Sequence, residues 1–302
     1  MKSFYRHLSE KGEVMASFEK IVGDIYVLKA PFGGLWTGVT LIRGEKNYLI
    51  DSGADAPEVY LIPALRELGL ELSDISYLLN THCHGDHISG HYDLVSKYGL
   101  RVATARVGAK TLSDPASNAV RIRTRFPEFS PAPQSWLKGV EADVVLEDGE
   151  VLDGRLRLIL TPGHDHDCVA WYDIPSKTII CGDSLQANGT PSQGVGFYSD
   201  LSAYLSALDR LLSEDIENII CGHEYDGMGD FILGCENVKQ ALTYCKELPE
   251  AYEKKIAQYL KDGMTEPSEI AVRLINEVGC GMPEKLFLAL YTVTQHLARL
   301  NP

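Results

Sequence analysis

Short apolar runs separated by polar turns dominate the first part of the chain. Ile25 to Leu28 forms one such run and ends near Pro31, while Val39 to Ile42 and Tyr48 to Ile50 flank a polar turn that contains Gly44. Two apolar runs joined by a short glycine-containing turn predict a β-hairpin.

Segments with helical spacing alternate with these strands. Apolar residues recur every three or four positions from Pro57 to Leu68, and this segment stops at Gly69. Ile75 to Leu79 is a continuous apolar run, which is typical of a buried strand. The next segment, Ile88 to Tyr98, is predicted to be a helix that ends before Gly99.

The pattern changes twice beyond residue 104. The segment Ala105 to Gly139 carries four prolines and has arginines at alternate positions, which predicts an inserted loop and a helix pair. From Asn237 to Arg299 the pattern is helical, with two glycine-containing breaks. Mixed strands and helices followed by helices alone predict an α/β or α+β sandwich with a helical C-terminal extension.

Charge narrows the function classes. The chain has 28 basic and 42 acidic residues, a formal net charge of −14, so we do not expect it to bind nucleic acid, which requires basic surface. Apolar residues make up 45% of the chain, as in ordinary globular proteins. No apolar run approaches the roughly 20 residues that span a membrane, so no membrane association is expected.

Cysteine usage and the N-terminal sequence favour a cytoplasmic protein. The seven cysteines are odd in number and none has CxxC spacing, so we do not expect a disulfide framework. The first 20 residues lack the apolar core and cleavage pattern of a signal peptide.

Three of the nine histidines lie within six residues. His82 and His84 point to the same side of an extended chain, because side chains alternate along it. Gly85 permits a sharp turn, after which Asp86 and His87 stand at the start of the following helix. Imidazole and carboxylate groups are ligands that suit zinc, and also iron or manganese.

Four apolar strands end just before residues that can bind metal. The first, Ile75 to Leu79, precedes the histidine-rich segment. The other three are Leu156 to Leu160 before His164, Thr178 to Cys181 before Asp183, and Asn218 to Cys221 before His223. Ligand sites of open α/β sheets favour the carboxyl ends of strands. We therefore expect these residues to converge on one site.

These motifs resemble those of the metallo-β-lactamase superfamily, whose mark is HxHxDH followed by a distant His, Asp and His. The resemblance extends from Ile21 to Gly229, and Asp51 to Gly53 matches an upstream DxG element. It implies an αββα sandwich with metals at one edge of the two sheets. Residues 1–236 would form this catalytic domain, and residues 237–302 a helical C-terminal extension.

The resemblance also implies a role for each residue of the motifs. His82, His84 and His164 would hold one metal ion, Asp86, His87 and His223 a second, and Asp183 would bridge both. Asp86 and Asp183 are the catalytic candidates, because Asp86 could orient a bridging hydroxide and Asp183 would offset the repulsion between ions about 3.5–4 Å apart. We expect two divalent ions, zinc first, with iron or manganese as alternatives. Asp51 is expected to accept a hydrogen bond from a ligand imidazole.

The sequence departs from the family pattern after His164. The family usually continues with threonine and small residues, whereas Asp165, His166 and Asp167 follow here. A carboxylate at Asp165 thus replaces the hydroxyl that supports a ligand. His166 and Asp167 add potential ligands, which either support the ligand set or alter which metal is preferred; a charged surface turn is the alternative.

Candidates for substrate contact lie on flanking segments. Phe32 to Trp36 could form an aromatic flap, the segment after Asp183 contains Phe197 and Tyr198, and Tyr225 could bind a developing oxyanion. Ordinary packing is the alternative for each aromatic side chain.

Three arginines and two apolar helix faces in the C-terminal region could also contact a ligand or another protein chain. Arg121, Arg123 and Arg125 could hold a carboxylate or phosphate, although we favour a solvated helix face. Apolar stripes in Ser268 to Val278 and Pro283 to Leu300 indicate core packing first, with a homodimer or a cover over the site as alternatives.

The expected activity is hydrolysis of a small carbonyl ester, lactone or thioester through a metal-bridging hydroxide. The acidic chain disfavours polyanionic substrates, so a small molecule is the expected partner. The alternative is a mononuclear iron dioxygenase of the persulfide type, which the same superfamily contains and which uses a subset of the same residues.

Overall fold

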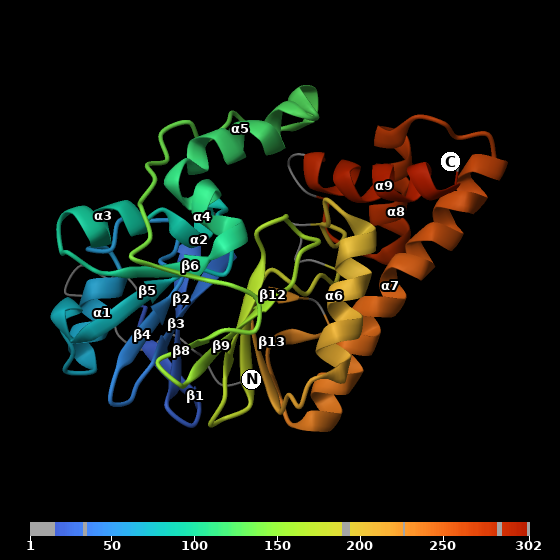
Figure 1. Ribbon diagram of the computed structural model, residues 1–302. Coiled ribbons are helices and arrows are strands. Elements are labelled where there is room, and N and C mark those ends of the chain that lie inside the picture. The colour runs from blue at the N-terminus through green and yellow to red at the C-terminus, as the bar shows by residue number, and fades with distance from the viewer. Residues whose placement is uncertain (1–15, 33–34, 189–193, 226, 283–285, 301–302) are drawn as a thin grey trace.

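The computed structural model describes residues 16–32, 35–188, 194–225, 227–282 and 286–300. Two β-sheets face each other at the centre, and helices cover the outer face of each sheet (Figure 1). This four-layer arrangement confirms the αββα sandwich, and further helices follow it in the C-terminal region. Among the described residues, none of the helices combines the length and the apolar character needed to cross a membrane.

The first sheet has seven strands arranged in sequence order. They are β1 (Phe18–Val22), β2 (Ile25–Phe32), β3 (Leu35–Ile42), β4 (Asn47–Ile50), β5 (Ile75–Leu79), β6 (Val102–Ala105) and β7 (Val144–Leu146). Strands β1 to β4 pair in antiparallel fashion, and β4 to β7 pair in parallel. The antiparallel β3–β4 pair is the hairpin that the sequence predicts.

The second sheet has six strands in the order β13-β12-β11-β10-β9-β8. They are β8 (Val151–Leu152), β9 (Leu156–Leu160), β10 (Val169–Asp173), β11 (Thr178–Gly182), β12 (Asn218–Tyr225) and β13 (Gly229–Leu233). Among the described strands of this sheet, β11 and β12 are the one parallel pair. The carboxyl ends of these two strands therefore lie at the same edge of the sheet.

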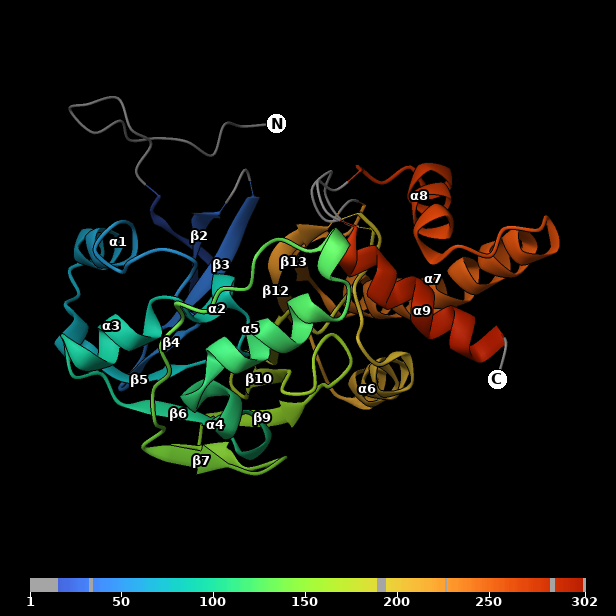
Figure 2. The ribbon, with the colours of Figure 1, turned by 90° about the horizontal axis from the view of Figure 1, so that it is seen from above.

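Helices occupy both flanks and one end of the sandwich. They are α1 (Leu61–Glu67), η1 (Leu72–Asp74), α2 (Gly85–Ile88), α3 (His91–Ser96), α4 (Arg106–Ser113), α5 (Pro115–Thr124), η2 (Pro127–Phe129), α6 (Leu201–Ser213), α7 (Cys235–Lys261), α8 (Pro267–Val278) and α9 (Phe287–Leu300). Viewed from above, α5 crosses the middle of the molecule and its end approaches α9 (Figure 2). The predicted inserted helix pair is thus α4 and α5.

The core between the sheets consists of the side chains that alternate inward along the strands. Val27, Leu79, Leu158, Trp171 and Ile180 are buried there. Burial of each such apolar side chain contributes about 1.5–3 kcal/mol to folding. Separate apolar clusters join α1 and α3 to the first sheet and α6 and α7 to the second, so both outer faces are covered.

Three elements differ from the sequence prediction, two of them in the first half of the chain. Strand β2 continues through Pro31 to Phe32, because Pro31 lies in the β2–β3 hairpin opposite Trp36. The helix predicted from Ile88 to Tyr98 is divided into α2 and α3, since the amide of Gly90 donates to Oγ of Ser52 at 3.0 Å.

Strand β12 also extends beyond its predicted end at Cys221. It runs to Tyr225, so His223 belongs to the strand and does not follow it. A register irregularity against β13 separates Ile220 from Tyr225.

Candidate metal centre

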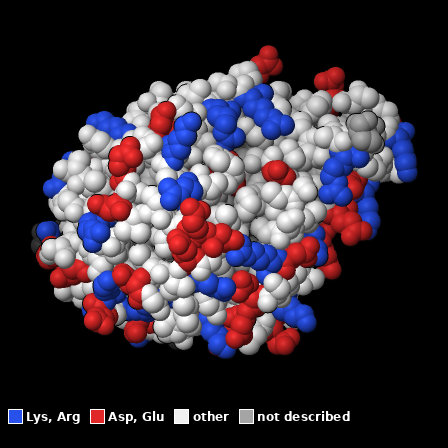
Figure 3. Space-filling model, viewed as in Figure 1, with Lys and Arg blue, Asp and Glu red and all other residues white. Residues whose placement is uncertain are grey.

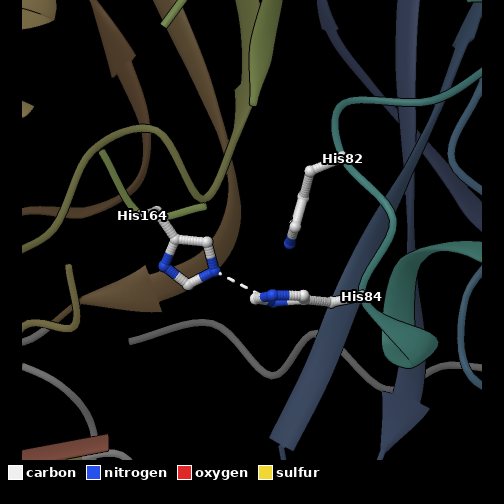
Figure 4. A group of neighbouring side chains, drawn as sticks. All are labelled: His82, His84 and His164. Atoms are coloured by element: carbon white, nitrogen blue, oxygen red, sulfur yellow. Dashed lines mark hydrogen bonds between the residues drawn. The ribbon is translucent and has the colours of Figure 1, made fainter. Parts of the chain in front are cut away.

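The four strand ends converge as the sequence predicts. The loop after β5 supplies His82 and His84, the loop after β9 supplies His164, the end of β11 leads into Asp183, and β12 carries His223. Asp86 and His87 lie in the first turn of α2. In Figure 4, His82 and His84 come from one side of the centre and His164 faces them from the other.

One group of side chains that could hold a metal ion contains three histidines. Ring nitrogens of His82, His84 and His164 all lie within 4.8 Å of one another. Nε2 of His164 is 3.1 Å from Nδ1 of His84, the contact dashed in Figure 4. Three imidazoles that converge in this way offer three nitrogen ligands to one ion.

A second group combines a carboxylate with two histidines. Asp86, His87 and His223 also place ligand atoms within 4.8 Å of one another. Nε2 of His223 lies 3.1 Å from Oδ2 of Asp86, and Nε2 of His87 lies 3.6 Å from the same oxygen. This group could hold a second ion.

Asp183 lies between the two groups. Its Oδ1 is 3.4 Å from Nε2 of His87, and its Oδ2 is 3.5 Å from Nε2 of both His164 and His223. Gly222 leaves room for this carboxylate, since a Cβ at that position would lie 2.5 Å from Oδ1 of Asp183. Asp183 therefore contacts rings of both groups with different oxygens.

All five ligand-group histidines use one ring nitrogen for a hydrogen bond that orients the ring. The partners are Asp51 for Nδ1 of His87, the Phe197 carbonyl for Nδ1 of His164, the Trp36 carbonyl for Nδ1 of His223, Asp165 for Nε2 of His84 and the Thr81 hydroxyl for Nδ1 of His82. A carbonyl oxygen only accepts, so the Nδ1 atoms of His164 and His223 carry hydrogen. In the neutral form of each ring, Nε2 then carries the lone pair that would bind metal.

Buried polar atoms at the centre lack partners among the described residues. Nε2 of His82, Nε2 of His87 and Oδ1 of Asp183 are buried without a hydrogen bond. A buried polar atom without a partner costs free energy, so such atoms are rare unless they serve a ligand. A cation would satisfy all three, and the nitrogen and oxygen donors suit zinc, iron or manganese.

The protonation states of His82, His164 and Asp183 suit metal binding. Burial lowers the pKa of His82 well below its usual range and the pKa of His164 to about 4, so both rings are neutral at pH 7. Burial alone would raise the pKa of Asp183, but the nearby His223 and His87 hold it well below the usual value. Neutral imidazole and ionised carboxylate are the forms that bind metal. Burial would lower the pKa of His87 and of His223, but the nearby carboxylates raise the first well above its usual value and the second to about 10, so these two rings must lose a proton when an ion binds.

Asp51 supports the centre as predicted. Its Oδ2 lies 2.8 Å from Nδ1 of His87 and accepts from the Thr81 hydroxyl at 2.8 Å, while its Oδ1 accepts from the Thr81 amide at 2.7 Å. The buried carboxylate thereby fixes both the His87 ring and the loop that begins the histidine-rich segment.

Asp165 takes the place of the expected hydroxyl. It accepts from Nε2 of His84 at 3.2 Å, from Nδ2 of Asn118 at 3.2 Å and from Nη2 of Arg121 at 2.6 Å. Burial would raise its pKa, but the bonds from His166 and His84 lower it below its usual range, so Asp165 is ionised. The arginine and the asparagine both come from α5, which ties the inserted helix to a candidate ligand.

His166 and Asp167 lie outside the central cluster. His166 is half exposed, and its Nδ1 lies 3.0 Å from Oδ1 of Asp165. Asp167 is buried, and its oxygens have no hydrogen-bond partner among the described residues. With Asp165 they form a separate group of ligand-type atoms.

A cavity of about 400 Å³ opens beside the cluster, with His84, Asp86, His164, Asp183 and His223 in its wall. Phe197 and Tyr225, two aromatic candidates from the sequence, also line it. Tyr198 does not, because its hydroxyl is bonded to His296 in a buried contact.

The predicted aromatic flap is only partly described. Phe32 and Leu35 line the cavity, whereas Gly33 and Gly34 lie outside the described residues. Trp36 contributes its backbone carbonyl, which accepts from His223 at 2.6 Å.

Sequence reasoning missed several residues around this cavity. Asn118 and Gln134 come from the insert, and Phe287 and Leu288 come from α9. The insert's position after the histidine-rich segment pointed to the first pair. Nothing in the sequence places the start of α9 at the same cavity.

The three arginines of the insert differ in their surroundings. Arg121 is bonded to Asp165, Arg125 is exposed, and Arg123 is partly buried in the cavity wall. The favoured interpretation of a solvated helix face is therefore wrong for Arg123, because α5 turns this side chain inward. Lys and Arg side chains gather at the upper edge of the molecule, over α5, despite the acidic net charge (Figure 3).

Comparison with known families gives one match. The model that describes the metallo-beta-lactamase superfamily matches residues 37–223. The matched region includes the six residues of the two candidate metal groups and Asp183, which lies between them.

Individual relatives agree with this match. The chain is 33% identical over 212 residues to a hydroxyacylglutathione hydrolase from Rhodopseudomonas palustris, which covers 67% of this chain and 72% of the relative. It is 29% identical over 251 residues to a hydroxyacylglutathione hydrolase from a Synechococcus species, and this alignment covers 76% of this chain and 81% of the relative. A metallo-beta-lactamase family protein from Thermus thermophilus shares the fold, with a TM-score of 0.71 and 24% sequence identity. The superposition covers 92% of this chain and 93% of that protein.

Proposed function

The chain belongs to the metallo-beta-lactamase superfamily and is a metal-dependent hydrolase of that fold, and on this premise we propose that it cleaves a small carbonyl ester, lactone or thioester. We place thioesters first, because the relatives above are named for the release of an acyl group from glutathione.

The observation that carries this proposal is the position of the candidate centre in the wall of one cavity. Two ligand groups, joined by Asp183, face a space of about 400 Å³ that has both apolar and polar walls. Such a space suits a small, partly apolar molecule. We assign His82, His84 and His164 to one ion, Asp86, His87 and His223 to the other, and Asp183 to both.

Divalent ions bound there would polarise a carbonyl oxygen and lower the pKa of water to about 7. Asp86 is the residue that would orient the attacking water and hold its proton, since its carboxylate lies in the cavity wall and its side chain is 18% exposed. The identity of the ions is part of the proposal: zinc first, with iron or manganese as alternatives.

Tyr225 is placed to bind the oxyanion that develops at the carbonyl. Its hydroxyl oxygen accepts from Nε2 of Gln186 at 2.9 Å, which leaves its own hydrogen free to donate. Burial raises the pKa of Tyr225 well above its usual range, so the hydroxyl stays protonated. A fixed neutral donor beside the cluster would stabilise negative charge as it forms.

The C-terminal helices act as a cover in this proposal. We assign residues 1–236 to the catalytic domain and 237–302 to the extension, from which Phe287 and Leu288 complete the cavity wall. The apolar stripes of α8 and α9 are buried inside the chain, for example Ile270 and Val293. This supports core packing of the stripes over a homodimer formed through them.

A substrate panel tests the reaction class. Zinc-loaded and manganese-loaded protein would be assayed with p-nitrophenyl esters, homoserine lactones, glutathione thioesters and bis-p-nitrophenyl phosphate. We expect turnover of one or more carbonyl substrates and little cleavage of the phosphate diester. Activity on the phosphate diester alone would contradict the proposal.

A further inference from the structure

One cation in the cavity wall has an unsatisfied donor. Arg123 lies on α5, and its Nη1 is buried without a hydrogen-bond partner among the described residues. The guanidinium carbon lies 4.0 Å from the centre of the Phe287 ring, so the plane of the side chain packs against α9. This stacking holds the group in place but satisfies none of its N–H donors.

The two neighbouring arginines, Arg121 and Arg125, have different surroundings from Arg123. Nη2 of Arg121 forms an ion pair with Oδ1 of Asp165 at 2.6 Å. Arg125 is exposed and lies 4.7 Å from the centre of the Tyr291 ring, outside the cavity wall. Of the three, only Arg123 lines the cavity that also contains Asp86 and Asp183.

A buried cation without a hydrogen-bond partner raises the free energy of the folded protein unless a ligand pairs with it. Guanidinium stays protonated in proteins, so Arg123 cannot relieve the cost by losing its charge. Burial lowers its pKa, and the charge of Asp86 across the cavity offsets this only in part. The cavity wall therefore carries a positively charged donor, Nη1 of Arg123, that has no acceptor among the described residues.

We infer that Arg123 binds a carboxylate of the substrate, so that the enzyme acts on a small acyl thioester or ester that carries a carboxylate at one end. This inference rests on the proposed function. The guanidinium fork matches a planar carboxylate in a two-bond contact. A phosphate dianion fits less well, because the single guanidinium of Arg123 would neutralise only one of its two charges.

The apolar lining of the cavity indicates what joins the two ends of the substrate. Ile122, Val195, Phe197 and Leu288 line the same cavity as Arg123 and the metal groups. A short hydrocarbon segment would pack on these side chains while the carboxylate reaches Arg123 and the reactive carbonyl reaches the metals. The substrate class is thus a monoanionic carbonyl compound with an apolar middle.

Matched substrates separate charge recognition from catalysis. The first pair is the acetyl thioester of 3-mercaptopropionate and that of its amide, with the charge on the leaving side. The second pair has glutaryl and glutaramyl groups on a neutral thiol, with the charge on the acyl side. We expect wild-type zinc-loaded protein to prefer the carboxylate in one of the pairs, and Arg123→Gln to lower kcat/KM for that carboxylate about tenfold or more.

Two variants and a binding measurement complete the test. Arg123→Lys should restore part of the preference, and Arg125→Gln, which removes the same charge from the C-cap of the same helix, should leave both pairs unchanged. Equal losses on the carboxylate and the amide in Arg123→Gln, or no preference in the wild type, would overturn the inference and leave the hydrolase proposal standing.

If the protein hydrolyses none of these thioesters, the proposed thioester hydrolysis is contradicted, while the role of Arg123 is still to be decided. Calorimetric binding of the inert ketone analogues, in which a methylene separates the carbonyl from sulfur, then decides the inference. Tighter binding of the carboxylate analogue than of its amide, lost in Arg123→Gln, would support it. Equal affinities would overturn it.

Discussion

The imidazole of His84 lies between two partners: its Nε2 is 3.2 Å from Oδ2 of Asp165, and its Nδ1 is 3.1 Å from Nε2 of His164. The carboxylate therefore fixes which nitrogen faces the centre. Because Asp165 is in turn held by Arg121 and Asn118, the inserted helix α5 helps to set the geometry of a candidate ligand.

Replacing Asp165 should weaken metal binding. Asp165→Ala removes the acceptor for His84, and partners of this kind typically cost 10–100-fold in metal affinity. Zinc affinity, measured by competition with a chromophoric chelator, should fall by about that factor for one ion. Asp167→Asn serves as the control, since Asp167 is buried nearby and makes no hydrogen bond to a ligand histidine. Equal losses in the two variants would contradict this role.

Asp183 and Asp51 should differ in the metal content of their variants. Asp183 contacts histidines of both groups, whereas Asp51 is bonded to one candidate ligand, through Nδ1 of His87. Asp183→Ala should therefore weaken both ions and remove most activity, while Asp51→Ala retains part of the metal. Elemental analysis after gel filtration checks this. Complete loss of metal in both would remove the distinction.

Gly222 should not tolerate even a methyl group. A Cβ there would lie 2.5 Å from Oδ1 of Asp183 and 2.8 Å from Cε1 of His87. Gly222→Ala should displace these side chains and reduce metal content and activity at least tenfold. Gly108→Ala is the matched control, because its Cβ would meet atoms no closer than 3.6 Å. Full activity in Gly222→Ala would show that the close contact is not restrictive.

His91 should make the metal-free protein sensitive to acid. Burial lowers the pKa of His91 to about 3, against 6.5 in the unfolded chain. Below pH 6.5 the unfolded chain takes up a proton that the folded protein refuses, so stability falls as the pH falls from 6.5 toward 3.

The His91 contribution can be isolated by substitution. His91→Asn keeps an acceptor for Ser52, whose Oγ lies 2.9 Å from Nδ1 of His91. Between pH 7 and 4.5, the wild type should lose about 2–3 kcal/mol more free energy of unfolding than the variant. Urea denaturation of both proteins with a chelator present gives these values, and parallel pH profiles would contradict the assignment.

Much of the centre was predictable because its residues are local or follow strands. His82, His84 and His87 fall within six residues, and His164, Asp183 and His223 each follow an apolar run closely. The sheets bring those runs together at one edge, so pattern and topology lead to the same residues. Asp51 was predictable for the same reason, as it follows β4.

The surroundings of the centre were not predictable in the same way. Whether Arg123 faces solvent or the cavity depends on how α5 is rotated and on its packing against Phe287, a contact across 164 residues of sequence. Local patterns do not record such a contact. The extension of β12 to Tyr225 was missed because Gly222 interrupts the apolar run, although the glycine is needed there to make room for Asp183.

The central claim is a two-metal centre that hydrolyses a carbonyl substrate. The most direct test is a titration of metal-free protein with zinc, in which the rate of thioester hydrolysis is followed against equivalents of metal per chain. The account predicts a rate that rises until two equivalents are bound and then levels off. A plateau at one equivalent, or no hydrolysis at any zinc level together with oxygen consumption by the iron-loaded protein on glutathione persulfide, would contradict it.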